Sequence, residues 1–164
     1  MERRDKVNYY LDIAEAVSER STCLRKRWGT VIVNNDEIIA TGYNGAPRGR
    51  INCSELGFCR KKKLFPDTRH AGYDACRSVH SEQNALLSAS RRDMIGADLY
   101  LVAVRCDTED YEEGPNSCML CRKLIINSGI NKVIIRINKN EYKIIEVEKD
   151  WIQVDESLTD QISY

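Results

Sequence analysis

The sequence predicts an α/β domain in which a mixed central sheet is covered by helices on both faces. Two observations lead to this prediction. Short apolar, β-branched runs alternate along the chain with amphipathic helical patterns, and a turn sequence suited to a hairpin joins the first two runs. The chain has 164 residues, which is about the length of one ordinary domain. We therefore expect a single domain over residues 1–164.

The first part of the chain predicts a helix, a hairpin and a long irregular segment. Apolar residues recur at helical spacing within residues 2–20, namely Val7, Leu11, Ala14 and Val17. Residues 30–34 and 37–41 are apolar and β-branched, and Asn34-Asn35-Asp36 between them suits a tight turn. Residues 43–77 are rich in turn signals and irregular. A segment of this length inside a compact domain needs an anchor.

The rest of the chain alternates helices and strands. We expect helix 78–92, strand 99–104, helix 117–128 and strands 132–137 and 142–147. Ser78 can cap the first of these helices. Gly129 can end the second in a left-handed conformation. This order of helices and strands predicts one α/β domain with a mixed sheet.

The composition narrows the classes of function. The 25 basic and 25 acidic residues give a formal charge of zero, which argues against a protein that wraps duplex nucleic acid. Apolar residues make up 42% of the chain, yet no run approaches the ~20 residues that a membrane span requires. The N-terminus, MERRDKVNYY, lacks the hydrophobic core of a secretion signal. We expect a cytoplasmic protein, and the balanced charge does not exclude a small anionic ligand held by two or three local arginines.

Seven cysteines stand against two histidines. In a reducing cytosol this number favours metal binding or catalysis over disulfides. Cys118 and Cys121 lie at a predicted helix start, where one turn can direct both sulfurs to one point and the helix dipole favours thiolates. His80 stands near the start of another predicted helix and supplies a third ligand. Three protein ligands leave one tetrahedral position open, which is typical of catalytic zinc.

Glu82 completes this pattern, because H-x-E followed downstream by P…C-x-x-C is typical of zinc-dependent nucleobase deaminases. Zinc held by His80, Cys118 and Cys121 would lower the pKa of a bound water from ~15.7 towards ~7. Glu82 would carry the proton from this water to ring nitrogen N3 and then protonate the departing ammonia. We therefore predict hydrolytic deamination with Glu82 as the catalytic residue.

Three segments of the chain resemble the deoxycytidylate deaminase family: WGTVIVNNDEIIATGYNGAPRG, VHSEQNALLSASR and GPNSCMLCRKLIINSGINKVII. The likeness covers residues 5–137, and cytidine deaminases usually have cysteine where His80 stands. The resemblance implies a cytidine-deaminase-like three-layer α/β/α sandwich, conversion of dCMP to dUMP and often a homo-hexamer. It also implies that Asn44 binds the sugar 3′-hydroxyl. The backbone N–H of Ser81, which stands where Ala is common, would contact the pyrimidine carbonyl.

The chain departs from the family in the loop before the C-x-x-C motif, which begins at Cys118. The family usually has Pro directly before its first cysteine, whereas Asn116 and Ser117 separate Pro115 from Cys118 here. Because this loop shapes the base pocket, a deaminase of cytidine, of a modified cytosine nucleotide or of a purine stays an alternative. A non-catalytic zinc-stabilised regulatory module is another, although it would not need Glu82. Editing of single-stranded nucleic acid is disfavoured by the neutral charge and the few aromatic residues.

A nucleotide phosphate requires local cations. The candidates for phosphate or effector binding are Arg27, Arg48 and Arg91. In the family that the chain resembles, the GYNG region and the position of Arg91 are tied to regulation by dCTP and dTTP, and such an effector could bring Mg²⁺. Each of these arginines could equally be an ordinary solvated charge.

A second zinc ion could anchor the long segment 43–77. Four cysteines outside the catalytic motif could supply its ligands: Cys23, Cys53, Cys59 and Cys76. His70 could replace Cys59 or Cys76, and the alternative is that these are loop thiols without a metal. Cys106, at the end of a predicted strand, is expected to be a free thiol.

Overall fold

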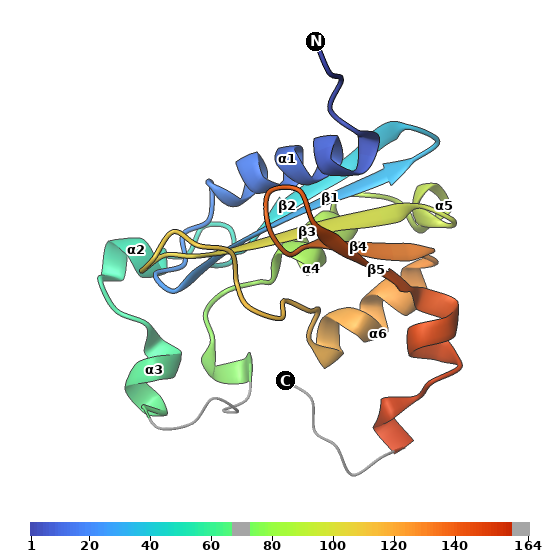
Figure 1. Cartoon of the computed structure of the whole chain (residues 1–164). Coiled ribbons are helices and arrows are strands. Elements are labelled where there is room, and N and C mark those ends of the chain that lie inside the picture. The colour runs from blue at the N-terminus through green and yellow to red at the C-terminus, as the bar shows by residue number, and fades with distance from the viewer. Residues whose placement is uncertain (67–72, 159–164) are drawn as a thin grey trace.

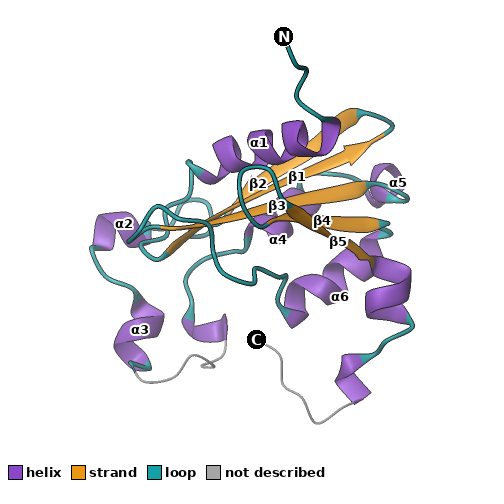
Figure 2. Cartoon of the chain, viewed as in Figure 1, coloured by secondary structure: helices purple, strands orange, loops and turns teal. Residues whose placement is uncertain are grey.

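The computed structural model describes residues 1–66 and 73–158 (Figures 1 and 2). The helices are α1 (Lys6–Ser18), α2 (Cys53–Leu56), α3 (Arg60–Leu64), α4 (Ser81–Leu87), α5 (Arg91–Met94) and α6 (Met119–Ser128). The strands are β1 (Lys26–Asn34), β2 (Glu37–Tyr43), β3 (Asp98–Arg105), β4 (Lys132–Arg136) and β5 (Tyr142–Glu146). Short turns of helix cover Tyr73–Ala75, Glu148–Ile152 and Glu156–Leu158.

The five strands form one mixed sheet in the order β2-β1-β3-β4-β5. Strands β3 and β4 are parallel, and every other neighbouring pair is antiparallel. Helix α1 packs on one face of the sheet, whereas α4 and α6 lie side by side on the other (Figure 1). Each face buries its own apolar cluster, with Leu11 and Val31 on the α1 side and Leu99 and Ile125 on the α6 side. The predicted three-layer α/β fold is confirmed.

Two predicted helix boundaries were wrong. The expected helix 78–92 is two helices, because His80 and not Ser78 is the N-cap of α4, and the chain leaves the helix after Leu87. Ser90 then caps α5 by accepting a hydrogen bond from the Asp93 amide. The second correction is small. Helix α6 begins after Cys118, whose sulfur accepts a hydrogen bond from the Cys121 amide, and Gly129 ends it with φ 82° as predicted.

A buried guanidinium ties α1 to β4. Arg136 is fully buried and donates hydrogen bonds to Asp12 Oδ1 at 2.8 Å and to Glu15. Partial burial works against ionisation of Asp12, but hydrogen bonds from three cations outweigh it and lower the pKa of this carboxyl to about 2. The three cations are Arg4, Arg136 and Lys139. A buried charge is tolerated only when it is paired and hydrogen-bonded, as it is here.

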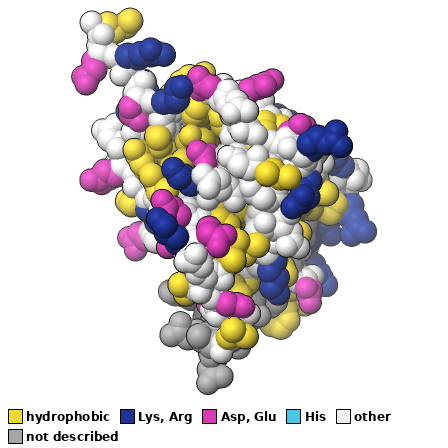
Figure 3. All heavy atoms as spheres, turned by 90° about the vertical axis from the view of Figure 1, so that its right-hand side faces the viewer, with side chains coloured by type: hydrophobic (Ala, Val, Ile, Leu, Met, Phe, Trp, Pro, Cys, Tyr) yellow, Lys and Arg dark blue, Asp and Glu magenta, His cyan; other side chains and the backbone are white. Residues whose placement is uncertain are grey.

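The surface agrees with the balanced charge of the chain. Basic and acidic side chains both occur across the face shown in Figure 3. Among the helices in residues 1–66 and 73–158, none has the length and apolar character needed to cross a membrane. All seven cysteines are free thiols.

Candidate metal centre and active site

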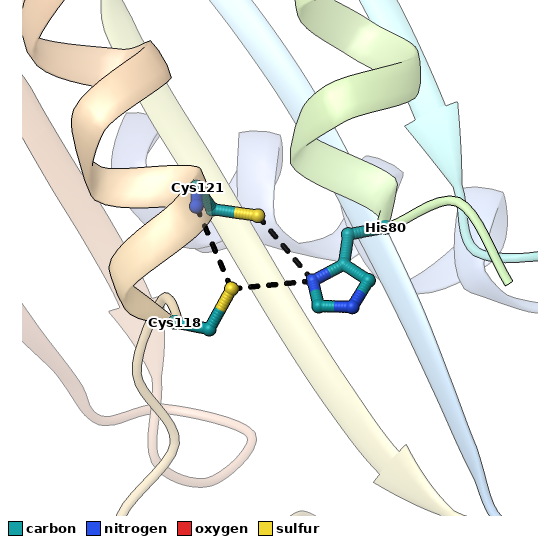
Figure 4. A group of neighbouring side chains, drawn as sticks. All are labelled: His80, Cys118 and Cys121. Carbon is teal, nitrogen blue, oxygen red and sulfur yellow. Dashed lines mark hydrogen bonds between the residues drawn. The ribbon is translucent and has the colours of Figure 1, made fainter. Parts of the chain in front are cut away.

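Three side chains converge where α4 and α6 begin (Figure 4). His80 is the N-cap of α4, Cys118 is the N-cap of α6, and Cys121 lies in the first turn of α6. The Nδ1 atom of His80 is 3.4 Å from the Sγ atoms of both Cys118 and Cys121. Within the described ranges, this is the one group of metal-ligating residues whose donor atoms all lie within 4.8 Å of one another.

The spacing of these donor atoms fits zinc. Bonds of ~2.3 Å to sulfur and ~2.0 Å to nitrogen place tetrahedral S and N ligands about 3.5 Å apart. The charges fit a cation as well. The hydrogen bond from Cys121 lowers the pKa of the Cys118 thiol, and the same bond raises the pKa of Cys121, since two buried sulfurs resist ionising together. A divalent cation allows both to be thiolates.

Glu82 follows two residues after the histidine ligand and is 3% exposed. Burial raises the pKa of its carboxyl, which is the direction that brings the pKa of an acid–base catalyst closer to neutral pH. Ser81 Oγ lies 3.2 Å from Glu82 Oε2, and Thr30 Oγ1 lies 2.8 Å from Ser81 Oγ. Ser117 Oγ is also buried. Ser117 Oγ has no hydrogen-bond partner among the described residues. The Ser117 side chain nevertheless lies near enough to Glu82 to lower the pKa of the Glu82 carboxyl.

His80 has a neighbour that the sequence did not indicate. Burial works against its protonation, but Cys118 and Glu82 outweigh burial and raise the pKa of the ring. Lys61, on the short helix α3, acts in the opposite direction. The irregular segment therefore brings a cation close to the metal centre.

Asn44 is buried and holds the start of β1 in place. Its Oδ1 accepts hydrogen bonds from the Trp28 amide at 2.8 Å and from Ser21 Oγ at 2.6 Å. Its Nδ2 donates to the Lys26 carbonyl at 2.9 Å. Three of the four hydrogen-bonding positions of the amide are thus used within the protein, and one Nδ2 hydrogen is left over.

The predicted phosphate or effector arginines lie apart from one another. Arg27 is paired with Glu109, while its Nε is buried without a partner among the described residues. Arg48 lines a cavity of about 350 Å³ together with the GYNG residues Gly42 and Tyr43. Arg91 does not line that cavity and instead donates to the Asn127 carbonyl at the end of α6.

The four cysteines predicted to bind a second zinc ion lie near one another. Their sulfur atoms are not all within 4.8 Å of one another, as the donor atoms of His80, Cys118 and Cys121 are. Burial raises the pKa of the Cys53 thiol, and neighbouring thiols add to the shift. Those neighbours are Cys23, Cys59 and Cys76. A hydrogen bond from the Ser54 amide to the Thr22 carbonyl joins the segment that contains Cys53 to the segment that contains Cys23. The alternative ligand His70 lies outside the described residues.

The mixed α/β/α fold and the site define a class. A histidine and two cysteines at two helix starts, with a buried glutamate two residues after the histidine, are the arrangement of a zinc-dependent nucleobase deaminase domain. The model of the family described as the cytidine and deoxycytidylate deaminase zinc-binding region matches residues 4–137, and the chain belongs to this family.

Relatives agree with this assignment. The chain is 38% identical to a deoxycytidylate deaminase of Mycobacterium phage D29 over 136 residues, which cover 82% of this chain and 96% of the phage protein. It is 35% identical to a deoxycytidylate deaminase of Schizosaccharomyces pombe over 133 residues, covering 81% of this chain but only 37% of that protein. The crystal structure of apo dCMP deaminase from the cyanophage S-TIM5 matches with a TM-score of 0.56 and 27% identity, covering 82% and 85% of the two chains.

Proposed function

We propose that this chain is a zinc-dependent hydrolase that converts dCMP to dUMP and releases ammonia. The observation that carries the proposal is the convergence of His80, Cys118 and Cys121 beside the buried Glu82. Two deoxycytidylate deaminases are 38% and 35% identical to the chain. A second structure of the cyanophage enzyme was solved with dCMP and dUMP, and it matches with a TM-score of 0.52 and 26% identity over 82% of this chain and 84% of that chain.

The residues divide the chemistry between them. His80, Cys118 and Cys121 would hold the zinc ion, which supplies a Lewis acid that makes water acidic near neutral pH. Glu82 takes a proton from the attacking water and delivers it to N3 of the ring, so that C4 becomes electrophilic. The water oxygen bonds to C4 and the bond from C4 to the exocyclic nitrogen breaks. Glu82 takes the second proton from the hydroxyl now on C4 and passes it to this nitrogen, which leaves as ammonia.

Binding of the nucleotide would use groups around this centre. The Ser81 amide belongs to the first turn of α4 and has no acceptor within its helix, so it can donate to the pyrimidine carbonyl. Asn44 has one amide hydrogen left for the sugar 3′-hydroxyl. Arg27 is a candidate for the phosphate, which would compete with Glu109 for its guanidinium.

Further proposals concern regulation and assembly. Cys23, Cys53, Cys59 and Cys76 would bind a second, structural zinc ion, with His70 as a possible substitute ligand. The cavity that Arg48 lines would take a dCTP or dTTP effector with Mg²⁺, while Arg91, which lies outside that cavity, is a further candidate for effector binding. We further propose a homo-oligomer, a hexamer by resemblance to the family, in the cytoplasm, where the absence of disulfides among the seven cysteines would be maintained.

A substrate panel tests the function. Ammonia release is measured for dCMP, CMP, deoxycytidine, cytosine, dCTP and guanine with the zinc-loaded chain. We expect the highest kcat/KM for dCMP. A higher value for another substrate would overturn the assignment of dCMP, and no turnover of any of them would favour the zinc-stabilised regulatory module. Repeating the dCMP assay with and without dCTP and Mg²⁺ tests the effector proposal.

A further inference from the structure

We propose that Thr30 and Ser81 form a hydroxyl relay that fixes the orientation of the Glu82 carboxylate. The inference rests on the deamination proposed above, and it assigns Thr30 and Ser81 as positioning residues. Both side chains are fully buried, so each hydroxyl must find a partner inside the protein. The two hydroxyls bond to each other, and that of Ser81 also bonds to the Glu82 carboxylate.

The direction of the hydrogen bonds follows from chemistry. In the state that takes a proton from water, the carboxylate is ionised and can only accept, so Ser81 Oγ donates to Glu82 Oε2 across 3.2 Å. A hydroxyl has one hydrogen to donate. Ser81 therefore accepts at its other side, and Thr30 Oγ1 donates to it across 2.8 Å. The relay thus runs in one direction, from Thr30 through Ser81 to Glu82.

The backbone places the two hydroxyls against each other. Thr30 pairs with Gly42 in the β1–β2 ladder. Because Gly42 has no side chain, the first turn of α4 comes close to the sheet at this point, which brings Ser81 within reach of Thr30. The pleat of β1 directs the Thr30 side chain to this face of the sheet, and β-branching leaves its hydroxyl few orientations there.

The relay distinguishes the two oxygens of Glu82. Oε2 is held by Ser81, which leaves Oε1 as the oxygen that exchanges a proton with water and with the ring. A carboxylate without this hydrogen bond can turn about its last bond, whose torsion is broad, and spends less time in the productive orientation. The structure therefore assigns the relay a role in the catalytic step and not in holding substrate or zinc.

Kinetics of four variants test the relay with dCMP as substrate. We expect Ser81→Ala to lower kcat about 10-fold, since a hydrogen bond to a charged group is lost, with KM and zinc content within about twofold of the wild type. Thr30→Val should lower kcat about 3-fold, and Thr30→Ser, which keeps the hydroxyl, should restore it. In the Ser81→Ala background, Thr30→Val should change kcat less than twofold, because Thr30 acts through Ser81.

Ser128→Ala is the matched control, because it removes a buried hydroxyl that bonds to the Ile125 carbonyl. It should leave kcat unchanged. Equal losses from Thr30→Val in both backgrounds, or a rise in KM with kcat intact, would overturn the relay. Absence of turnover in the wild type would instead overturn the proposed function.

If the wild type shows no turnover, the contact between Thr30 and Ser81 can still be tested by a stability measurement that needs no substrate. Unfolding by urea of the two single variants and the double variant should show non-additive losses of stability, as for residues in one hydrogen-bond network. Additive losses would contradict the contact between the two hydroxyls, whatever the enzyme acts on.

Discussion

Gly42 on β2 lies so close to Ser81 on α4 that a Cβ atom at position 42 would stand 2.2 Å from the Ser81 carbonyl oxygen. The same atom would stand 2.4 Å from the Ala85 amide nitrogen. Both contacts are with backbone, which cannot rotate away as a side chain can. The height of α4 above the sheet, and with it the placement of His80 and Glu82, is therefore set by the missing side chain of one glycine.

Gly42→Ala should displace α4 and damage activity more than stability. Overpacking of this kind costs about 1–3 kcal/mol in unfolding free energy, and a shift of ~1 Å in a catalytic group can cost about 100-fold in rate. Urea unfolding and kcat for dCMP measure the two effects. Ile38→Ala, at a half-exposed position on the same strand, is the control and should leave kcat unchanged. An unchanged kcat in Gly42→Ala would contradict the dependence of the site on this contact.

Glu82→Gln should keep zinc and lose turnover. The amide retains the size of the side chain but cannot shuttle protons, and general acid–base catalysis is worth roughly 10²–10⁴ in rate. Metal content is measured by mass spectrometry on the same samples used for kinetics. Glu37→Gln, an exposed carboxyl at the start of β2, is the matched control. Full activity in Glu82→Gln would remove Glu82 from the mechanism.

Cys121→Ser should lose the catalytic zinc ion and lower the melting temperature. Cys121 is fully buried, and hydroxyl oxygen is a much poorer zinc ligand than a thiolate. Zinc-binding free energy contributes to folding free energy, so chelation of the wild type should destabilise it in the same direction. Retention of the full zinc content in Cys121→Ser would contradict the ligand set.

Cys53→Ala should reduce the zinc content from two ions per chain to one if the second site exists. The retained ion should still support turnover of dCMP, because Cys53 is not in the catalytic group. Cys106→Ala is the control, since this thiol belongs to neither predicted ligand set. A content of one ion per chain in the wild type, unchanged by Cys53→Ala, would remove the structural zinc.

Stability should fall in acid partly through Asp12. Its folded pKa of about 2 is lower than the ordinary value of 3.8, so its pairing with Arg136 stabilises the fold fully above about pH 4. As pH falls from about 4 to about 2, the unfolded chain takes up the proton first and this contribution is lost. Asp12→Asn should therefore differ from the wild type at neutral pH and converge with it near pH 2. Urea unfolding as a function of pH measures the difference, and parallel curves would contradict the prediction.

The sequence predicted the sheet and the metal centre from local patterns. The β-branched runs indicated the strands. The H-x-E motif at His80 and the C-x-x-C motif at Cys118 and Cys121 together indicated the metal centre. The break between α4 and α5 was missed because Ser90 begins a new helix inside a pattern that reads as continuous. A serine that caps a new helix ends the one before it, and this local effect leaves the spacing of the apolar residues unchanged.

The positioning role of the Thr30 and Ser81 hydroxyls could not be found in this way, since the sequence pointed only to the backbone N–H of Ser81. Thr30 and Ser81 are 51 residues apart, and Thr30 reads as an ordinary β-branched strand residue. Their contact depends on the pairing of two strands and on the approach of a helix, which no spacing in the sequence encodes. The same holds for Ser117 and Lys61, whose proximity to Glu82 and His80 arises from tertiary structure alone.

His80 and Cys118 are separated by 38 residues, and the chain between them contains β3. Strand β3 lies between β1 and β4, so a bound ion would join the two ends of the chain segment that supplies the central strand. The ion would thereby close a loop of 38 residues. Loss of the metal should therefore destabilise this segment together with the site.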